Sequence, residues 1–227
     1  MKKYPKIQTL FKRCTENGPN KNKLIEGDWT LPEFEALKDL EWEATEKVDG
    51  TNISVHWGDD KVEFFGRDEN AQIPARLVNW LIGVFTVERF RDLGLPEMTI
   101  FGERYGDGIQ KIGKDYCEPG VVSFAAFDIW CGDLWLEARN MQEVAGSIGV
   151  SCVQQHEPLT LHRAIDVVRR GFDSSITKPR SKDRAQAEGL VLRAPHGLLN
   201  RRGERIICKI KTKDFTRGMV TKAEDVK

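Results

Sequence analysis

The stretch Glu46-Lys47-Val48-Asp49-Gly50-Thr51-Asn52 decides how the middle of this chain folds. The residues just before it alternate in character from one position to the next, and Ile53, Val55 and Trp57 continue the same period of two after it. Both flanks are therefore predicted to be β-strands. The Asp-Gly pair between them is a strong turn signal. Lys47 is predicted to lie at the bend of this strand-turn-strand element.

Outward from this element, short strands and helices alternate along the chain. The sequence Gly58-Asp59-Asp60 predicts a second hairpin. Helices are predicted at residues 32–40, 74–93, 140–148 and 161–170, the last with Thr160 as its N-cap, and strands at residues 62–65, 98–103, 121–130, 134–137, 188–193 and 205–210. Because hairpin-length connections dominate, we expect an α+β fold with mainly antiparallel sheets and flanking helices.

The length and charge of the chain limit its architecture and its partners. Its 227 residues favour one large domain spanning residues 1–227. It has 35 lysines and arginines against 35 aspartates and glutamates, so it lacks the strongly basic character typical of nucleic-acid-binding domains. Binding of a polyanion would need a local patch, and a run of basic residues is about as often a solvated surface. The candidates are Lys178, Arg180, Lys182, Arg184, Arg193, Arg201, Arg202, Arg205, Lys209, Lys211 and Lys213.

The cysteines and the apolar residues indicate the compartment. An odd number of cysteines is spread along the chain without a C-x-x-C pair or zinc-ligand spacing, so we expect reduced, structural thiols at Cys14, Cys117, Cys131, Cys152 and Cys208. No signal peptide opens the sequence, and its longest apolar stretch, residues 121–130, is about half a membrane span. We therefore expect a cytoplasmic protein without a membrane partner.

Further motifs follow the Lys47 segment in a fixed order. Lys-x-Asp-Gly alone is commonly an ordinary turn, and each later motif is equally weak by itself. Together and in order, however, they resemble the motifs of the covalent nucleotidyltransferases, which include polynucleotide ligases and capping enzymes, over roughly residues 46 to 213. The resemblance implies a catalytic domain with a nucleotide cleft of the nucleotidyltransferase, ATP-grasp-like type. The motifs are Gly66-Arg67-Asp68-Glu69, Phe101-Gly102-Glu103-Arg104-Tyr105-Gly106, Ser123-Phe124-Ala125-Ala126-Phe127-Asp128-Ile129, Ala187-Glu188-Gly189-Leu190-Val191-Leu192-Arg193 and Cys208-Lys209-Ile210-Lys211.

Lys47 is the candidate nucleophile of this chemistry. Attack on the α-phosphorus of ATP requires a neutral amine, whereas an unperturbed lysine has a pKa of about 10.4. A bound divalent metal, Mg²⁺ or Mn²⁺, and neighbouring cations such as Lys209 and Lys211 would disfavour a charged amine there. Expulsion of water by the bound nucleotide would act in the same direction.

The lysine pair and two glutamates are the other candidate catalytic and metal-binding residues. Lys209 and Lys211 are two apart on a predicted strand, so both project to one face and can meet a triphosphate. A solvated lysine stripe is the alternative. Glu103 can accept hydrogen bonds from ribose hydroxyls, and Glu188 can hold a metal ion through water. We predict metal binding at Glu188 and Glu103, although either could be an ordinary strand-end residue.

The resemblance implies roles for residues that periodicity alone would not single out. Phe127 matches an aromatic residue that stacks on the purine, with Phe124 as the fallback on the opposite face. Arg67 matches an arginine that contacts phosphate, and Glu46 flanks the nucleophile where backbone groups read the adenine edge. Asn52, which closes the first motif, is expected to complete the nucleotide-binding residues.

The first motif also indicates the branch of the superfamily. Gly50-Thr51-Asn52 is similar to the form found in RNA ligases that seal nicks in duplex RNA, although Asp49 stands where that subgroup often has histidine. We therefore expect an ATP-dependent RNA ligase that joins a 5′-phosphate to a 3′-hydroxyl RNA end. The alternatives are a DNA ligase, an mRNA guanylyltransferase and a non-catalytic nucleic-acid-binding relative. No C-terminal OB or helical domain is apparent. Binding of RNA would therefore depend on the domain's own surface or on an accessory protein or domain.

Overall fold

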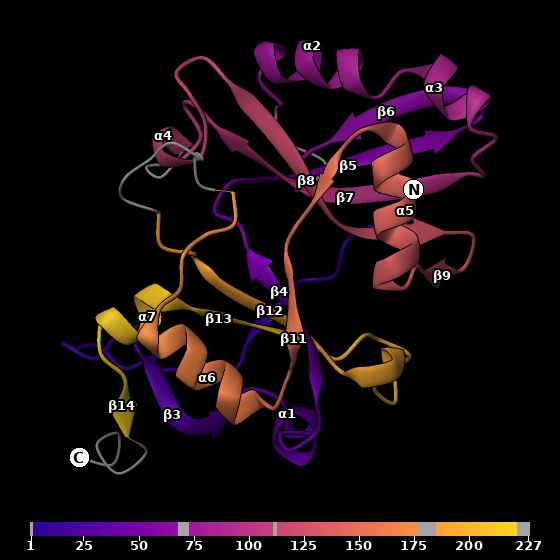
Figure 1. Ribbon diagram of the computed structural model, residues 1–227. Helices are drawn as coiled ribbons and strands as arrows, with labels where there is room; N and C mark the ends of the chain where they lie inside the picture. Colours follow the sequence, from indigo (N-terminus) through magenta and orange to yellow (C-terminus); the bar gives the residue numbers. More distant parts are fainter. Residues whose placement is uncertain (1, 68–72, 111–112, 177–184, 222–227) are drawn as a thin grey trace. The chain divides into compact units, whose positions relative to one another are not determined.

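The computed structural model describes residues 2–67, 73–110, 113–176 and 185–221 (Figure 1). Their contacts divide them into two compact units. Unit 1 draws on residues 2–5, 49–153 and 176, and unit 2 on residues 6–48, 154–175 and 185–221. Both units combine sheets with helices, and antiparallel strand pairs predominate. The expected α+β fold is confirmed.

Unit 1 is built on one six-stranded sheet. The strand order is β10-β8-β7-β5-β6, and β9 pairs with β8. Only the β10–β8 pair is parallel among the pairs described for this sheet. The strands are β5 Thr51–Gly58, β6 Lys61–Phe65, β7 Met98–Gly106, β8 Val122–Cys131, β9 Leu134–Trp135 and β10 Ser151–Cys152.

Helices bury one face of this sheet. They are α2 Ala75–Val84, α3 Val87–Asp92, α4 Gly113–Tyr116 and α5 Ala138–Ile148. Apolar side chains of α2, α3 and α5 join Ile53, Val55 and Trp57, the alternating residues of β5, in one core. The single helix predicted at residues 74–93 is interrupted, because buried Phe85 ends α2 and Thr86 accepts a hydrogen bond from Arg89 N as the N-cap of α3.

Unit 2 contains a five-stranded and a three-stranded sheet. The larger has the order β1-β13-β12-β4-β11 and the smaller the order β14-β3-β2. The strands are β1 Gln8–Thr9, β2 Phe11–Arg13, β3 Leu24–Trp29, β4 Trp42–Lys47, β11 Gln155–Leu159, β12 Gly189–Arg193, β13 Ile207–Lys211 and β14 Val220–Thr221. The helices are α1 Pro32–Ala36, α6 Leu161–Arg170, α7 Thr212–Thr216 and the 3-10 turn η1 Pro195–Gly197.

Helix α6 covers one face of the five-stranded sheet, which leaves the other face for polar groups. It begins at the predicted N-cap Thr160, whose hydroxyl accepts a hydrogen bond from Arg163 N at 3.3 Å. Its apolar stripe packs against the alternating residues of β4, β12 and β13 that point the same way. Those residues are Trp42, Ala44, Leu190, Leu192, Cys208 and Ile210.

The strands on either side of Asp49-Gly50 do not form a hairpin with each other. Strand β4 pairs with β11 and β12, whereas β5 pairs with β6 and β7. Each strand already has a neighbour on both edges, so the turn carries the chain from one sheet into the other. The predicted strand-turn-strand order is right, and the hairpin pairing is wrong.

Two further expectations concern cysteines and membranes. All five cysteines are free, as predicted. Within the part of the chain that the structure describes, no helix is long and apolar enough to span a membrane.

Candidate functional site

The nucleophile candidate lies at the end of a central strand, in a row with another predicted residue. Lys47 is the last residue of β4, and Gly189 is its partner at the start of β12. Gly189 is also the partner of Lys211, the last residue of β13. Three strands therefore end in one row, with a glycine between two lysines.

Gly189 allows the backbone of β13 to approach β12 closely. Its φ is +151°, and a Cβ built on it would lie 2.0 Å from Ile210 O and 2.8 Å from Lys211 Cα. Side chains do not approach backbone that closely, so only glycine fits here without a backbone shift. The spacing between Lys47 and Lys211 depends on this residue.

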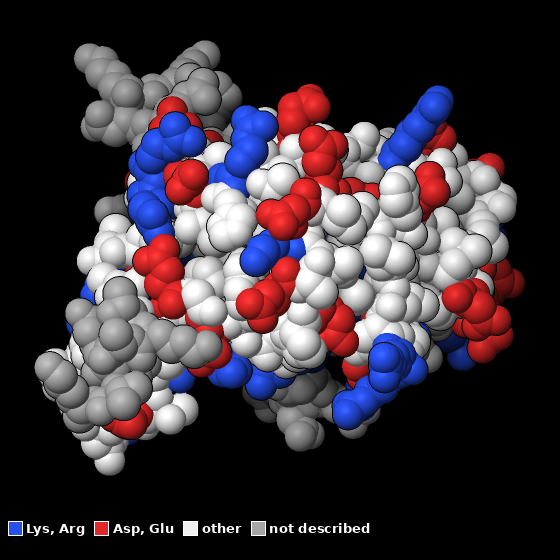
Figure 2. All heavy atoms as spheres, turned by 90° about the horizontal axis from the view of Figure 1, so that it is seen from below, with Lys and Arg blue, Asp and Glu red and all other residues white. Residues whose placement is uncertain are grey.

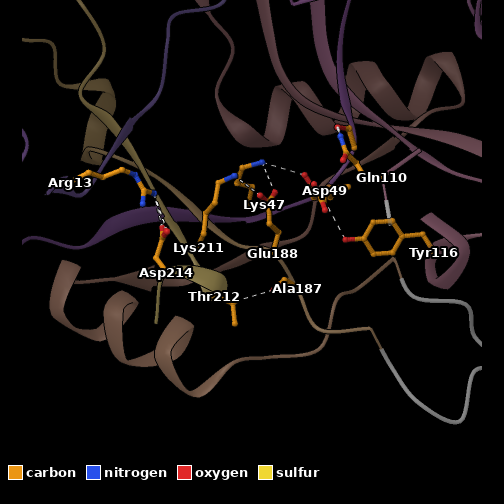
Figure 3. Close-up of polar contacts among 12 residues, drawn as sticks. Arg13, Lys47, Asp49, Gln110, Tyr116, Ala187, Glu188, Lys211, Thr212 and Asp214 are labelled. Carbon is orange, nitrogen blue, oxygen red and sulfur yellow. Dashed lines mark hydrogen bonds and ion pairs between the residues drawn. The ribbon is translucent and has the colours of Figure 1, made fainter. Parts of the chain in front are cut away.

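Both lysines converge on the carboxylate of Glu188 (Figure 3). Lys47 Nζ lies 2.6 Å from Oε2, and Lys211 Nζ donates to Oε1 at 2.5 Å. The Glu188 side chain is only 10% exposed, and the backbone around it is fixed by α7, because Thr212 N donates to Glu188 O and Thr212 Oγ1 to Ala187 O. The result is a preorganised, half-buried cluster of two ammonium groups around one carboxylate.

The two lysines keep Glu188 ionised despite its burial. Burial alone would raise the pKa of this carboxyl group, but the charge of Lys47 and the hydrogen bond from Lys211 oppose it, and the net pKa is lowered. The ammonium group of Lys47 occupies the Oε2 side of this carboxylate at 2.6 Å. A cation could reach that oxygen only after Lys47 has moved away.

The lowered pKa of Glu188 predicts a pH-dependent contribution to stability. A carboxyl group whose pKa is lower in the folded state stabilises the fold above its unfolded pKa, about 4.3, and loses that contribution as pH falls through the folded pKa. In urea unfolding between about pH 2 and pH 7, the loss caused by Glu188→Gln should be largest and nearly constant above about pH 5 and should shrink as the pH falls below about 4.3.

The matched control is Glu143→Gln. Glu143 forms an exposed pair with Arg139 one helical turn away, and such pairs contribute little. Its effect should be small at every pH in the series. A Glu188→Gln effect that stays constant across the series would contradict the linkage.

Lys209 lies two residues before Lys211 on β13 and projects from the same face of the sheet. It is paired with Val191, which in turn is paired with Thr45. The next row adds Arg193, a buried guanidinium that donates to Thr45 Oγ1 at 3.1 Å. The face opposite α6 therefore gathers the positive charges of Lys47, Lys209, Lys211 and Arg193.

Glu46 points away from this face. Its carboxylate is 2% exposed and accepts three hydrogen bonds, from Ser174 Oγ at 2.5 Å, Ser175 N at 2.9 Å and Ser175 Oγ at 2.5 Å. The side chain thus ties β4 to residues 174–175 directly beside the nucleophile. The prediction for Glu46 concerned its backbone, whose N–H is engaged by Gln154 O.

Unit 1 brings together two of its predicted nucleotide-binding residues. Asn52 on β5 is the direct partner of Glu103 on β7, and both side chains are half-buried. The turn before Asn52 lies tightly against β7, since a Cβ on Gly50 would be 2.1 Å from Arg104 O. Gln110 donates to Gly50 O at 3.3 Å, and Tyr116 accepts from Asp49 N at 3.5 Å (Figure 3).

Phe127 lies at a β-bulge, on the face of this sheet opposite the helix-covered core. Phe101 pairs with Asp128 and Gly102 with Ala126, so Phe127 is the extra residue of the bulge. Its ring meets Tyr4 edge-on, with 5.1 Å between ring centroids. Phe124, the fallback, is 1% exposed in the helix-covered core, so only Phe127 is placed to meet a ligand.

The remaining predicted residues are dispersed. Arg67 is exposed just after β6, next to residues 68–72, which lie outside the described part of the chain. The basic run divides: Arg193 is buried, Arg201, Arg202 and Lys213 are exposed, and the cations at 178, 180, 182 and 184 lie outside the described residues. On the molecular face in Figure 2, basic and acidic side chains alternate without a continuous basic area.

The carboxylates fit a hydrated metal ion rather than a closed protein cage. Among the described residues, no group of three or more His, Cys, Asp and Glu side chains could hold a metal ion. Magnesium commonly binds through one or two carboxylates, several waters and substrate phosphates, so the ionised carboxylate of Glu188 suits that mode once Lys47 has left it. Glu103 belongs to the other unit, and its predicted metal role stays a prediction.

Several residues of the site were not predicted. Gly189 stands inside an apolar strand, where a glycine signals close backbone approach, and that signal could have found it. Tyr4, Gln110, Tyr116 and the Ser174–Ser175 pair carry no such signal. Their roles depend on contacts with residues far away in the sequence.

One family model matches this chain, and solved structures share its fold. The RNA ligase family model matches residues 40–211, most of the chain. Comparison with curated protein sequences gives no significant match. Among solved structures, *Naegleria gruberi* RNA ligase with PPi is 21% identical with a TM-score of 0.60, covering 80% of this chain and 52% of that one.

Two further structures of the *Naegleria gruberi* RNA ligase have the same fold. A variant with ATP and Mn is 20% identical with a TM-score of 0.58, covering 86% of this chain and 53% of that one. An apo variant is 19% identical with a TM-score of 0.60, covering 95% and 63%. This chain therefore spans between about half and two thirds of the length of those ligases. On the extent of the family match, the chain belongs to the RNA ligase family.

Proposed function

We propose that this chain acts as an ATP-dependent RNA ligase and that residues 1–227 work as one nucleotidyltransferase domain. The observation that carries the proposal is the Lys47–Glu188–Lys211 cluster at the ends of three adjacent strands. It gives a family nucleophile a fixed position beside an ionised carboxylate and a second cation. Family membership supplies the class of reaction.

The proposed reaction has three steps. The neutral amine of Lys47 attacks the α-phosphorus of ATP, a P–N bond forms, and pyrophosphate leaves. An RNA 5′-phosphate then attacks the same phosphorus and releases the lysine. Finally the 3′-hydroxyl of a second RNA end attacks the 5′-phosphorus, forms the phosphodiester and expels AMP.

The residues of unit 2 have distinct tasks in this scheme. An ammonium group held by a carboxylate is not a nucleophile, so Lys47 must leave Glu188 and lose its proton before attack. Lys211 and Lys209 stay on the same face as cations for the phosphates of ATP. A divalent ion, Mg²⁺ or Mn²⁺, would be held by Glu188 through water and would neutralise developing phosphate charge.

The residues of unit 1 are proposed to bind the nucleoside and its phosphate. Phe127 offers an aromatic face for adenine, and Glu103, paired with Asn52, offers a carboxylate for the ribose hydroxyls. Arg67, exposed at the end of β6, is proposed to contact phosphate. The *Naegleria* ligase variant solved with ATP and Mn supports the choice of ATP and a divalent ion.

A two-part assay tests the proposal. With α-labelled ATP and magnesium, the protein should form an acid-stable AMP adduct, and α-labelled GTP should give little. With a nicked duplex carrying a 3′-hydroxyl and a 5′-phosphate, we expect sealing when the 3′-hydroxyl strand is RNA and much slower sealing when both strands at the nick are DNA.

Each alternative has its own outcome in these assays. A GMP adduct would identify a guanylyltransferase, and equal or faster sealing of the all-DNA nick would identify a DNA ligase. A protein that binds ATP but never forms an adduct would be the non-catalytic relative. Only the pattern of ATP labelling with RNA-dependent sealing supports the proposal.

A further inference from the structure

The loop that joins β12 to β13 has an ordered tip. Asn200 N donates to Glu204 O at 2.8 Å, and Gly203 N donates to Asn200 O at 3.0 Å. The Asn200 side chain accepts from Arg202 N and Glu204 N and donates to the Glu204 carboxylate. An isolated bridge between Leu199 and Arg205 closes the base of this tip. These bonds fix the backbone of the loop tip.

The tip exposes both basic and apolar side chains. Arg201 and Arg202 are exposed. Leu198 and Leu199 are 42% and 53% exposed, and they are the only consecutive pair of large exposed hydrophobic residues within the described ranges. Glu204, just after the tip, accepts a hydrogen bond from the Asn200 amide at 2.8 Å, which holds its carboxylate against Asn200. A surface that combines arginines with apolar groups is suited to a polyanion that also has apolar faces.

The tip lies at a fixed distance from the nucleophile along the same strands. Lys47, Gly189 and Lys211 form the row at one end of the sheet, and Arg193 paired with Ile207 lies at the other end of β12 and β13. Four residue steps separate these rows, which is about 13 Å at about 3.3 Å per residue. The arginines of the loop are further still from Lys47.

We infer that the tip, residues 198–202, binds the backbone of an RNA duplex away from the ends that are being joined. This inference rests on the proposed RNA ligase activity and adds a second contact for the same substrate. Arg201 and Arg202 would contact phosphates, while Leu198 and Leu199 would lie against the sugar edges of the shallow groove of A-form RNA. The duplex must extend about 13 Å or more from the nick to reach them.

The test varies the length of the RNA on each side of the nick. Nicked RNA dumbbells keep one arm at about 12 base pairs and shorten the other from about 10 to 3, in two series that exchange the arms. The double variant Arg201→Gln, Arg202→Gln is compared with the wild type at subsaturating RNA. In one of the two series, the variant should seal the substrate with the longest variable arm at least about tenfold more slowly than the wild type. With the shortest arm in that series, the variant and the wild type should seal at similar rates.

Salt dependence provides a second readout. Phosphate contacts release counterions, so raising salt from about 50 to 200 mM should depress sealing far more than formation of the AMP adduct. For binding of a long duplex, loss of two contacts should make the slope of log affinity against log salt shallower by about 1.8. The control is Arg163→Gln, Arg170→Gln, which removes the same charge from exposed positions on α6 and should leave the slope unchanged.

The outcomes separate this inference from the proposed function. The AMP adduct is measured first without RNA, and its absence in the wild type would refute the ligase assignment itself. If the wild type seals RNA while the loop variant keeps the same slope and the same rates at every arm length, RNA does not bind the tip. An acidic protein surface would then be the occupant to seek.

Discussion

Lys47→Ala and Lys47→Arg should both reduce the AMP adduct to below about one thousandth of the wild-type amount. Alanine removes the amine, whereas arginine keeps a positive charge beside Glu188 but cannot lose its proton at neutral pH. The pair therefore separates the role of Lys47 as a nucleophile from its role as an ion-pair partner. Gel detection of protein-bound label after acid quenching measures the result.

The control for this series is Lys12→Ala. Lys12 is an exposed lysine of the same unit, paired with Asp28 at 2.9 Å, and lies outside the candidate site. Its variant should be labelled like the wild type. If Lys47→Arg were labelled normally, another residue would carry AMP, and the proposed role of the cluster would be wrong. Matched thermal melts of the arginine variant and the wild type would exclude unfolding as the cause.

Local sequence signals predicted the elements that carry the site. The Gly58-Asp59-Asp60 hairpin is confirmed, and Asp59 and Asp60 adopt the positive φ values of 49° and 57° that a tight hairpin turn requires. Helix α6 spans the predicted residues 161–170. The period of two correctly placed Lys209 and Lys211 on one face of β13.

Features that depend on strand register could not be predicted in the same way. Glu188 lies between Lys47 and Lys211 only because β4, β12 and β13 pair in one particular register across more than 140 residues of sequence. Pattern alone does not specify which strands are neighbours. For the same reason, the sequence pattern did not predict that the chain leaves one sheet and enters another after Lys47.

The bulge at Phe127 shows a second limit. Counting by twos correctly puts Phe124 and Phe127 on opposite faces, but the extra residue at the bulge reverses the count for the residues that follow, such as Ile129, and leaves no mark in the sequence. The choice of Phe127 over Phe124 came from the resemblance to a family. The burial of Phe124 beneath Gly102, where a Cβ would be 2.1 Å from its ring, supplies the physical reason for the choice.

A substitution at Gly189 tests whether the close spacing of Lys47, Gly189 and Lys211 positions the site. In Gly189→Ala, the new Cβ would meet Ile210 O at 2.0 Å, so β12 or β13 must move in the middle of a sheet. We expect a loss of at least about 3 kcal/mol in the free energy of unfolding, typical of severe backbone or packing defects. For a domain of this size, that loss corresponds to a Tm lower by about 6 to 12 °C. Scanning calorimetry or circular dichroism would measure it.

The effect on activity should exceed the effect on folding. If β12 or β13 moves, Lys211 and the Glu188 backbone change position relative to Lys47. A misplacement of about 1 Å can lower the reaction rate about a hundredfold. Adduct formation, measured well below the Tm of the variant, should therefore fall about a hundredfold in protein that remains folded. The control is Gly203→Ala, which also has a positive φ of 73° but has nothing within 4 Å of the new Cβ, so only about 1–2 kcal/mol of strain is expected. If Gly189→Ala melted within about 2 °C of Gly203→Ala and formed the adduct at the wild-type rate, the close approach of the three strands would have no part in positioning Lys47.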